Sequence, residues 1–217
     1  MNHRATGLVL GLGIALAVAA PADAQLWFFP DHAVPSAFGT PSSFVAGLYG
    51  GGLNETSGKL NAYGLVVGRT GLTERISVVL GGGMVDDVER EWTFGGSVGV
   101  DVLDADATTQ LSVQAGVGWI DFNFLDQPLT SLRFPIGVAL KKRIESESAT
   151  VIPWVMPRLN ITSLSGGDID DTQADFGASA GVGVTLTNGF GIHAALDVLA
   201  ANNTNWTFGV GAHYYIR

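Results

Sequence analysis

The sequence contains no cysteine, and this absence removes several kinds of site at once. Disulfide bonds and thiolate metal sites are excluded, and so is a lipid-modified N-terminal cysteine. Positive charge is also scarce, because 11 lysines and arginines stand against 20 aspartates and glutamates, for a net charge of −9. A nucleic-acid-binding protein normally carries a basic stripe, and none is present. We therefore expect no nucleic-acid partner, and the sequence predicts no cofactor.

Long apolar runs are missing as well, with one short exception near the N-terminus. Leu8–Ala20 is apolar, but it is shorter than the roughly 20 residues that a membrane-spanning helix needs. Arg4 precedes this run, and Ala22-Asp23-Ala24 follows it as a small-residue cleavage site. This order is typical of a secretory signal peptide. We predict three segments: a signal peptide over 1–24, a Pro-rich periplasmic segment over 25–42 and one folded domain over 43–217.

Glycine and alternating apolar residues are abundant instead. Glycine accounts for 30 of the 217 residues, against an average share of about 7%. In Trp206–Arg217 the even positions are apolar and most odd positions are small or polar, which is the period of a β-strand with one apolar face. Ten segments are strand candidates, although the faces of the first two are not assigned: Ser43–Gly51, Lys59–Arg69, Arg75–Val85, Trp92–Val102, Gln110–Trp119, Leu132–Lys141, Thr150–Thr162, Phe176–Thr187, Phe190–Val198 and Trp206–Arg217.

The length of these segments indicates a membrane protein. Each has about ten residues, as a tilted membrane-crossing strand requires, whereas soluble strands have about 5–6. Because lipid offers no hydrogen bonds to a strand edge, such strands must form a closed barrel. We predict an all-β fold, a single closed antiparallel up-and-down transmembrane β-barrel of about 10 strands with both termini on the periplasmic side. Eight strands would result if the first segment, or the segment with Pro153 and Pro157, lay outside the wall.

Connections and aromatic residues support the same fold. Tight turns such as Thr187–Gly189 alternate with longer connections such as Asp121–Thr130 and Ser163–Ala174, as in outer-membrane barrels. The alternative, a secreted soluble β-protein, would place its aromatic residues in mid-strand. Here they lie toward strand ends on the apolar faces, which predicts two girdles at the membrane interfaces. The girdle residues are Trp92, Phe94, Trp119, Phe134, Phe176, Trp206 and Phe208 at the outer end, and Phe190 and Tyr214 at the inner end.

On these patterns the chain resembles the small bacterial outer-membrane β-barrel proteins, the OmpA-, OmpX- and OmpW-like group, from about Ser43 to Arg217. The most specific match is the last strand, where Gly211, Tyr214 and Ile216 have the spacing of the family's assembly signal, although the chain ends in Arg217 rather than in phenylalanine. The resemblance implies export to the bacterial outer membrane, contact with its lipid and lipopolysaccharide, and recognition by the barrel-assembly machinery. It also implies a structural or narrow-pore role for small solutes. We expect no peptidoglycan-binding domain.

Charged residues at inward positions suggest two possible states of the lumen. They form ion pairs that fill a narrow lumen, or they line a pore and set its ion preference. The strand pattern leaves both open. The residues are Asp101, Arg133, Lys141, Arg143 and Asp197.

A second inward group could carry chemistry. His193, Asp197 and His213 share the inward parity of the last two strands, and the two histidines face each other if the hairpin centres near residues 201–203. Two imidazoles and a carboxylate could bind a metal or support acid–base catalysis in a hydrolase or lipid-modifying enzyme. No nucleophile motif accompanies them. We therefore predict a hydrogen-bonded lumen cluster and no enzyme.

The outer connections offer a third kind of function. Asp168, Asp170 and Asp171 form an acidic loop that could bind Ca²⁺, although its spacing does not match an EF-hand and acidic loops are often only solvated. The connections Asp121–Thr130 and Ser163–Ala174 could together form an adhesion or binding module. This is the alternative to a passive role.

Overall fold

The computed structural model describes residues 43–54, 59–70, 75–86, 90–103, 108–124, 127–200 and 204–216. The predicted signal peptide and the 25–42 segment lie outside these residues. No helix among the described residues has the length and apolar character needed to cross a membrane. The strands are β1 (Ser43–Asn54), β2 (Lys59–Thr70), β3 (Ile76–Asp86), β4 (Arg90–Asp101), β5 (Thr109–Phe124), β6 (Gln127–Lys142), β7 (Ile144–Glu145), β8 (Ala149–Gly166), β9 (Ile169–Leu186), β10 (Phe190–Ala200) and β11 (Thr204–Ile216).

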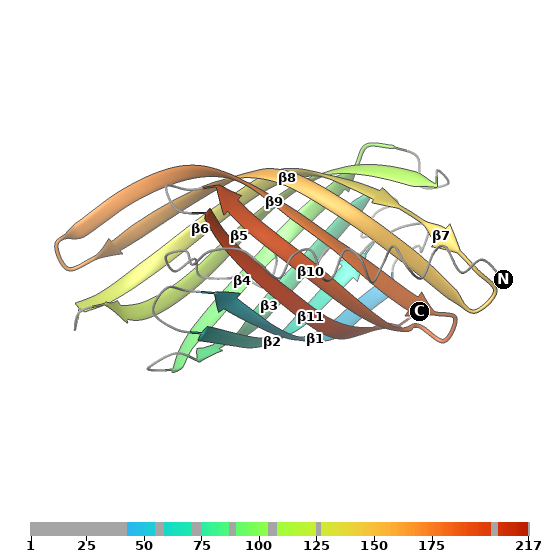
Figure 1. The fold of residues 1–217 in the computed structure, drawn as a ribbon, viewed down its shortest axis with the longest axis horizontal. Helices are drawn as coiled ribbons and strands as arrows, with labels where there is room; N and C mark the ends of the chain where they lie inside the picture. The colour runs from blue at the N-terminus through green and yellow to red at the C-terminus, as the bar shows by residue number, and fades with distance from the viewer. Residues whose placement is uncertain are drawn as a thin grey trace.

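The long strands form one closed antiparallel ring (Figure 1). Each pairs with its neighbour in sequence, β11 pairs with β1, and β6 pairs with β8. The two-residue strand β7 continues β6 along β8, where Ile144 pairs with Val151. The prediction of a closed ten-stranded barrel is therefore confirmed. Both ends of the wall lie at one rim, because Phe44 pairs with Ile216.

The registers fix the width of the barrel. A line of directly paired residues that leaves β11 at Ile216 passes once through every long strand and returns to β11 at Thr204, which is 216 − 204 = 12 residues away. With strands about 4.8 Å apart and residues about 3.3 Å apart, this stagger gives a tilt of about 40° and a backbone radius of about 10 Å. A long side chain on the inner wall therefore reaches most of the way to the axis.

The segment with two prolines belongs to the wall. It lies within β8, whose residues from Ala149 to Gly166 all pair with β9. Proline has no N–H to donate, so it is tolerated in a sheet only where a ladder hydrogen bond can be lost. The pairs that Pro153 and Pro157 would make with β6 are indeed absent from the ladder, while the register on either side of them is unchanged.

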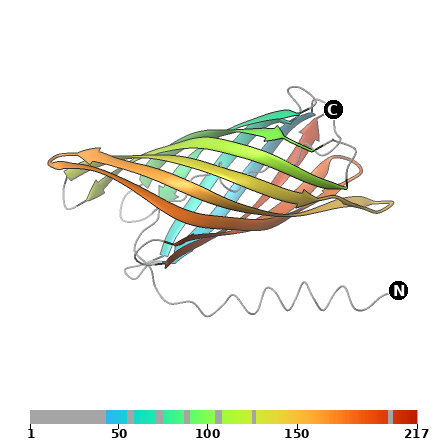
Figure 2. The same ribbon diagram turned by 90° about the horizontal axis from the view of Figure 1, so that it is seen from above.

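Four strands extend well beyond the others (Figures 1 and 2). Strands β5, β6, β8 and β9 have 16, 16, 18 and 18 residues, whereas the other long strands have 11 to 13. The sequence prediction of long connections at Asp121–Thr130 and Ser163–Ala174 was wrong, because both segments are largely paired strand. Above a membrane both faces of a hairpin meet water, so the apolar alternation is lost while the ladder continues. We call residues 121–130 and 163–175 the wing.

A glycine turn ends the longer hairpin of the wing. Gly166 and Gly167 adopt positive φ values of 146° and 56°, a conformation that glycine adopts without strain. A side chain on Gly166 would collide with the backbone of Pro128 and with Leu129, so the two hairpin tips pack against each other. Within the neighbouring hairpin, the Thr130 hydroxyl donates to the Asp121 carboxylate over 2.6 Å. The wing is therefore one packed unit.

Burial is the reverse of that in a soluble domain. Large apolar side chains cover the outer surface, including Leu80 (64% exposed), Trp92 (60%) and Phe176 (73%), while the polar side chains of Gln110, Ser112 and Asn160 are buried. Among the described side chains, this apolar belt runs from β3 to β11 and marks a surface that faces lipid. Among the predicted girdle residues, Trp92, Phe94, Phe134, Phe176, Phe190, Phe208 and Tyr214 are exposed on this surface. The Phe94 and Trp119 rings stack there with centroids 5.7 Å apart, and the Trp206 side chain lies outside the description.

Candidate functional site: a buried polar cluster in the lumen

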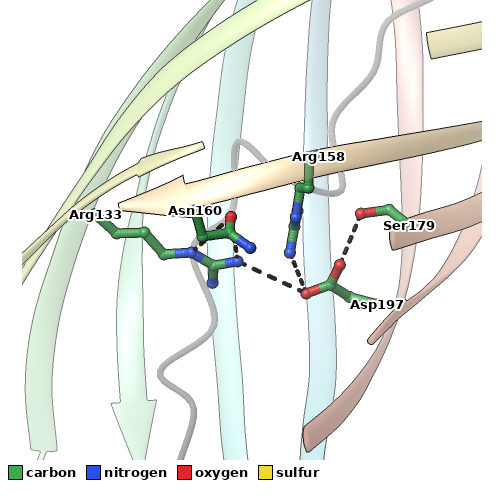
Figure 3. A network of polar contacts seen from close by, with 5 residues as sticks. All are labelled: Arg133, Arg158, Asn160, Ser179 and Asp197. Atoms are coloured by element: carbon green, nitrogen blue, oxygen red, sulfur yellow. Dashed lines mark hydrogen bonds and ion pairs between the residues drawn. The ribbon is translucent and has the colours of Figure 1, made fainter. Parts of the chain in front are cut away.

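Five polar side chains from four neighbouring strands meet inside the barrel (Figure 3). We call them the lumen cluster: Arg133 on β6, Arg158 and Asn160 on β8, Ser179 on β9 and Asp197 on β10. None is more than 3% exposed. Their positions follow from the strand registers. Ser179 pairs directly with Asp197 on β10 and with Met156 on β8. Arg158 lies two residues after Met156 and therefore on the same face of β8.

Asp197 is the centre of this cluster. One carboxylate oxygen, Oδ1, accepts a hydrogen bond of 2.7 Å from the Ser179 hydroxyl. The other, Oδ2, accepts a hydrogen bond from Nη2 of Arg158 and lies 3.9 Å from Nη2 of Arg133. The Asp197 side chain thus holds two arginines from two different strands. A buried carboxylate of this kind is stable only because charged donors surround it.

Arg133 is fixed from a second direction by Asn160. Its Nε and Nη2 atoms both donate to the Asn160 amide oxygen, over 3.2 and 2.9 Å. This two-donor contact orients the planar guanidinium group toward Asp197. Because β6 and β8 are neighbours in the wall, the contact also joins their inner faces. The cluster therefore has a fixed geometry that ties together β6, β8, β9 and β10.

Two further layers of side chains lie between the cluster and the rim at which both ends of the wall lie. The first is apolar and consists of Ala139, Trp154, Met156 and Ala195, none more than 8% exposed. The second layer is polar and consists of four buried side chains. Asp101 of β4 pairs with Ser112 of β5, and Lys141 of β6 pairs with Gln110 of β5. Asp101 and Lys141 line the same small cavity, which has room for about one water molecule.

The five predicted lumen charges therefore divide into three groups. Arg133 and Asp197 lie in the lumen cluster, and Asp101 and Lys141 lie in the lower layer. Arg143 lies at the rim, between β6 and β7, where its side chain is 26% exposed and pairs with Glu145. It is a rim residue rather than one of the packed lumen residues.

Sequence reasoning missed Arg158, Asn160 and Trp154, which all belong to β8. The reason is that both faces of this strand carry apolar residues, so the alternation alone does not separate inside from outside. A usable signal was present, because Pro153 and Pro157 share one parity. Assigning that parity to the lipid face would have placed Arg158 and Asn160 inside.

Comparisons with known proteins agree with this architecture. No protein-family model matches the sequence, and no curated protein does. Among solved structures, the chain is similar to the β domain of the Bordetella autotransporter BrkA, with 14% identity over 80% of this chain and 99% of that chain and a TM-score of 0.51. It is also similar to the translocator domain of the autotransporter NalP from Neisseria meningitidis, with 13% identity, coverages of 81% and 88% and a TM-score of 0.50.

The chain folds as an outer-membrane β-barrel. A further similar structure is the N-terminal β-barrel domain of Pseudomonas aeruginosa OprF, with 15% identity, coverages of 81% and 99% and a TM-score of 0.38. At identities this low, the similarities to the BrkA and NalP domains support the fold of the barrel and leave its role open.

The strand registers do not place the predicted histidine–aspartate group in direct pairs. His193 pairs with Gly211 and His213 pairs with Gly191, so the prediction that the two histidines face each other was wrong by two residues. The hairpin centres on residue 202, one position before the value that this prediction needed. His193 and Asp197 lie four residues apart on one strand, which separates them by about 13 Å. The His213 side chain lies outside the description.

The acidic residues of the wing are also spread out. Asp168 lies in the turn, while Asp170 and Asp171 are consecutive strand residues and therefore point to opposite faces of the hairpin. All three are exposed, and Asp171 accepts a hydrogen bond from Gln173 over 2.8 Å. Across the part of the chain that the structure describes, no three histidine or acidic side chains gather as a metal site would require.

Proposed function

We propose that this protein is a structural β-barrel of the bacterial outer membrane whose lumen is closed by the buried polar cluster. The observation that carries the proposal is Asp197, which holds Arg158 and Arg133 inside a barrel of only about 10 Å backbone radius. Residues 1–24 would direct its export and be removed. The partners would be outer-membrane lipid and lipopolysaccharide, with the barrel-assembly machinery acting on β11 through Gly211, Tyr214 and Ile216.

The proposal includes no catalytic role. The carboxylate of Asp197 already accepts hydrogen bonds from Ser179 and Arg158, which leaves it poorly placed to act as a base. The nearest imidazole on its strand is about 13 Å away along the backbone. A narrow pore for small solutes is the opposing view, and it requires that water and ions pass the lumen cluster.

Electrical recording from planar bilayers tests the closed lumen. The refolded chain over residues 25–217 should insert but give no resolved conductance steps, because both polar layers pack across the lumen. A variant with Arg133, Arg158 and Asp197 all replaced by serine should conduct better, since three charged side chains are removed from the lumen cluster. Discrete conductance steps from the unaltered chain would contradict the proposal and favour a pore.

The wing favours a second candidate function, a binding module at the cell surface. The observation is specific: four neighbouring strands continue past the apolar belt as a packed unit, and residues 170–174 of β9 are exposed on both faces. A barrel that only spans the membrane has no need of such an extension, because about 9–11 residues cross it. The partner would bind at the outer face.

Shortening the wing separates the two roles. Residues 122–129 and 164–171 would each be replaced by Asn-Gly, a two-residue hairpin turn that joins the directly paired residues Asp121 and Thr130, and Ser163 and Thr172. We expect the shortened barrel to keep its heat-modifiable migration in gels. If the wing is a binding module, cells carrying the short form should lose adhesion to host-matrix or cell surfaces that cells with the full form bind. Equal adhesion would remove this candidate.

A further inference from the structure

Strand β6 has interrupted ladders on both of its sides. Its ladder with β8 keeps one register from Thr130–Ser165 to Glu145 of β7, yet the pairs at Pro157 and Pro153 are missing. On its other side, the β5–β6 ladder omits the pair between Gly116 and Pro135 and the one beside it. A proline cannot donate the hydrogen bond that such a pair requires. Lipid supplies no substitute partner, so each gap weakens the wall at membrane depth.

Each gap omits two pairs, and the one at Pro157 lies directly in front of the apolar layer of the lumen. The missing pairs include Ala139 with Met156, and these two side chains belong to the buried apolar layer together with Trp154. On the outer side of the same seam, Ile136, Val138 and Val155 are 48%, 43% and 42% exposed on the lipid face. Apolar groups thus flank the gap on both sides. Among the described side chains, the lumen cluster lies on one side of this apolar layer, and Lys141, the direct partner of Trp154, lies on the other.

The wall beside the seam is also thin. Gly116 and Gly137 have no side chains, and they line a small cavity. Its other lining residues are the polar Ser97 and Gln114, together with Pro135, Met156 and Ala115, a lipid-facing position of β5. Gly137 cannot carry a side chain without shifting its neighbours, because a Cβ there would lie 2.9 Å from Met156 and from the Pro157 carbonyl oxygen. The cavity holds about one water molecule, so a larger guest requires β6 and β8 to separate.

We propose that the seam between β6 and β8 opens sideways to the bilayer and admits a hydrocarbon chain, which ends against Trp154. The inference rests on the proposed placement of the barrel in a membrane. An acyl chain fits because both sides of the gap and the layer behind it are apolar, while the polar layers above and below prevent the chain from passing along the lumen. The guest therefore enters and leaves through the wall, which is compatible with a lumen closed to ions.

Fluorescence quenching by brominated acyl chains tests this path. A single-tryptophan variant would keep Trp154 and carry phenylalanine at positions 27, 92, 119 and 206. In vesicles of phospholipid brominated along its acyl chains, we expect Trp154 to lose fluorescence to an extent approaching that of a second variant that keeps only the lipid-facing Trp92. Quenching of Trp92 with none of Trp154 would overturn the inference while leaving the membrane placement intact. Absence of quenching in both variants would contradict the membrane placement itself.

Disulfide staples identify the route. The natural chain has no cysteine, so Ile136→Cys with Leu159→Cys introduces one bond across the β6–β8 seam. Val151→Cys with Val184→Cys is the matched control, since it joins a lipid-facing pair across the unbroken β8–β9 seam. We expect the first staple, when oxidised, to abolish quenching of Trp154 and the second to leave it unchanged. Quenching that persists through the β6–β8 staple would overturn the proposed route.

Two further experiments identify the hydrocarbon that enters and test whether Pro157 causes the seam to open. In a second arm, brominated fatty acid is added to vesicles of ordinary phospholipid. Quenching with brominated phospholipid alone would identify a lipid tail as the hydrocarbon, and quenching with brominated fatty acid alone would identify a free acid. Quenching in neither arm overturns the inference. Pro157→Ala restores an N–H at the gap and should reduce quenching of Trp154 in whichever arm shows it. An unchanged signal in this variant would show that the proline does not control entry.

Discussion

Replacing Asp197 by alanine should lower the free energy of unfolding of the barrel by about 3–5 kcal/mol, the loss that follows when one member of a buried ion pair is removed. The physical reason is that Arg158 and Arg133 would keep their charges inside the barrel without the carboxylate that they share. Denaturant unfolding of the refolded protein in vesicles, followed by heat-modifiable migration, measures the change.

Two control variants make this result specific. Ser179→Ala removes only a neutral donor to the same carboxylate and should lower the unfolding free energy by about 1 kcal/mol. The double variant Arg158→Met with Asp197→Leu removes the charge pair and should be more stable than Asp197→Ala alone, because no arginine on β8 is left unpaired. A stability for Asp197→Ala equal to that of Ser179→Ala would mean that the pair contributes little to holding the wall together.

Val98→Arg should lower the free energy of unfolding by about 2–4 kcal/mol, as expected for arginine on the lipid face near the bilayer midplane. Val98 is 41% exposed and lies on β4 between the aromatic residues Trp92 and Phe94 on one side and Asp101 on the other. Arginine there would have to reach past apolar neighbours on both adjoining strands to meet water. The same unfolding measurement in vesicles detects the loss.

The matched control is Val102→Arg, just beyond the end of the same strand. This valine is 47% exposed, against 41% for Val98, but it lies close to the rim at which both ends of the wall lie. Arginine there should lower the unfolding free energy by only about 0–1 kcal/mol. Equal effects at the two positions would contradict a membrane that covers mid-strand. The comparison therefore tests the depth of the apolar belt as well as its presence.

The wall of the barrel was predictable from the sequence because the membrane imposes a strict alternation. Strands such as β10 and β11 meet lipid on one face and the packed lumen on the other, so a period of two identifies both faces. The same rule explains why Asp101, Lys141 and Arg133 were assigned to the inward side. Alternation fails once that contrast disappears, as in the wing, where water meets both faces and paired strand was taken for loop.

The candidate site was predictable only in part. Asp197 and Arg133 were recognised as inward charges, but their shared partner Arg158 was not, because β8 is apolar on both faces. The relation between His193 and His213 depended on the centre of a short connection, and a shift of one position there moves the pairing by two residues. Parity along a strand is thus readable from the sequence, whereas cross-strand register is determined by the turn.

The pairing of β1 with β11 has a consequence for how this protein can be made. The wall is completed by contacts between positions 44–53 and 207–216, which are the two extremes of the folded domain. Until the last strand has been synthesised, β1 has only one neighbour, and its other edge would face lipid with unpaired backbone groups. Insertion and closure of the wall must therefore come together, after β11 is available. A nascent fragment lacking β11 should be a substrate for envelope proteases rather than a smaller barrel.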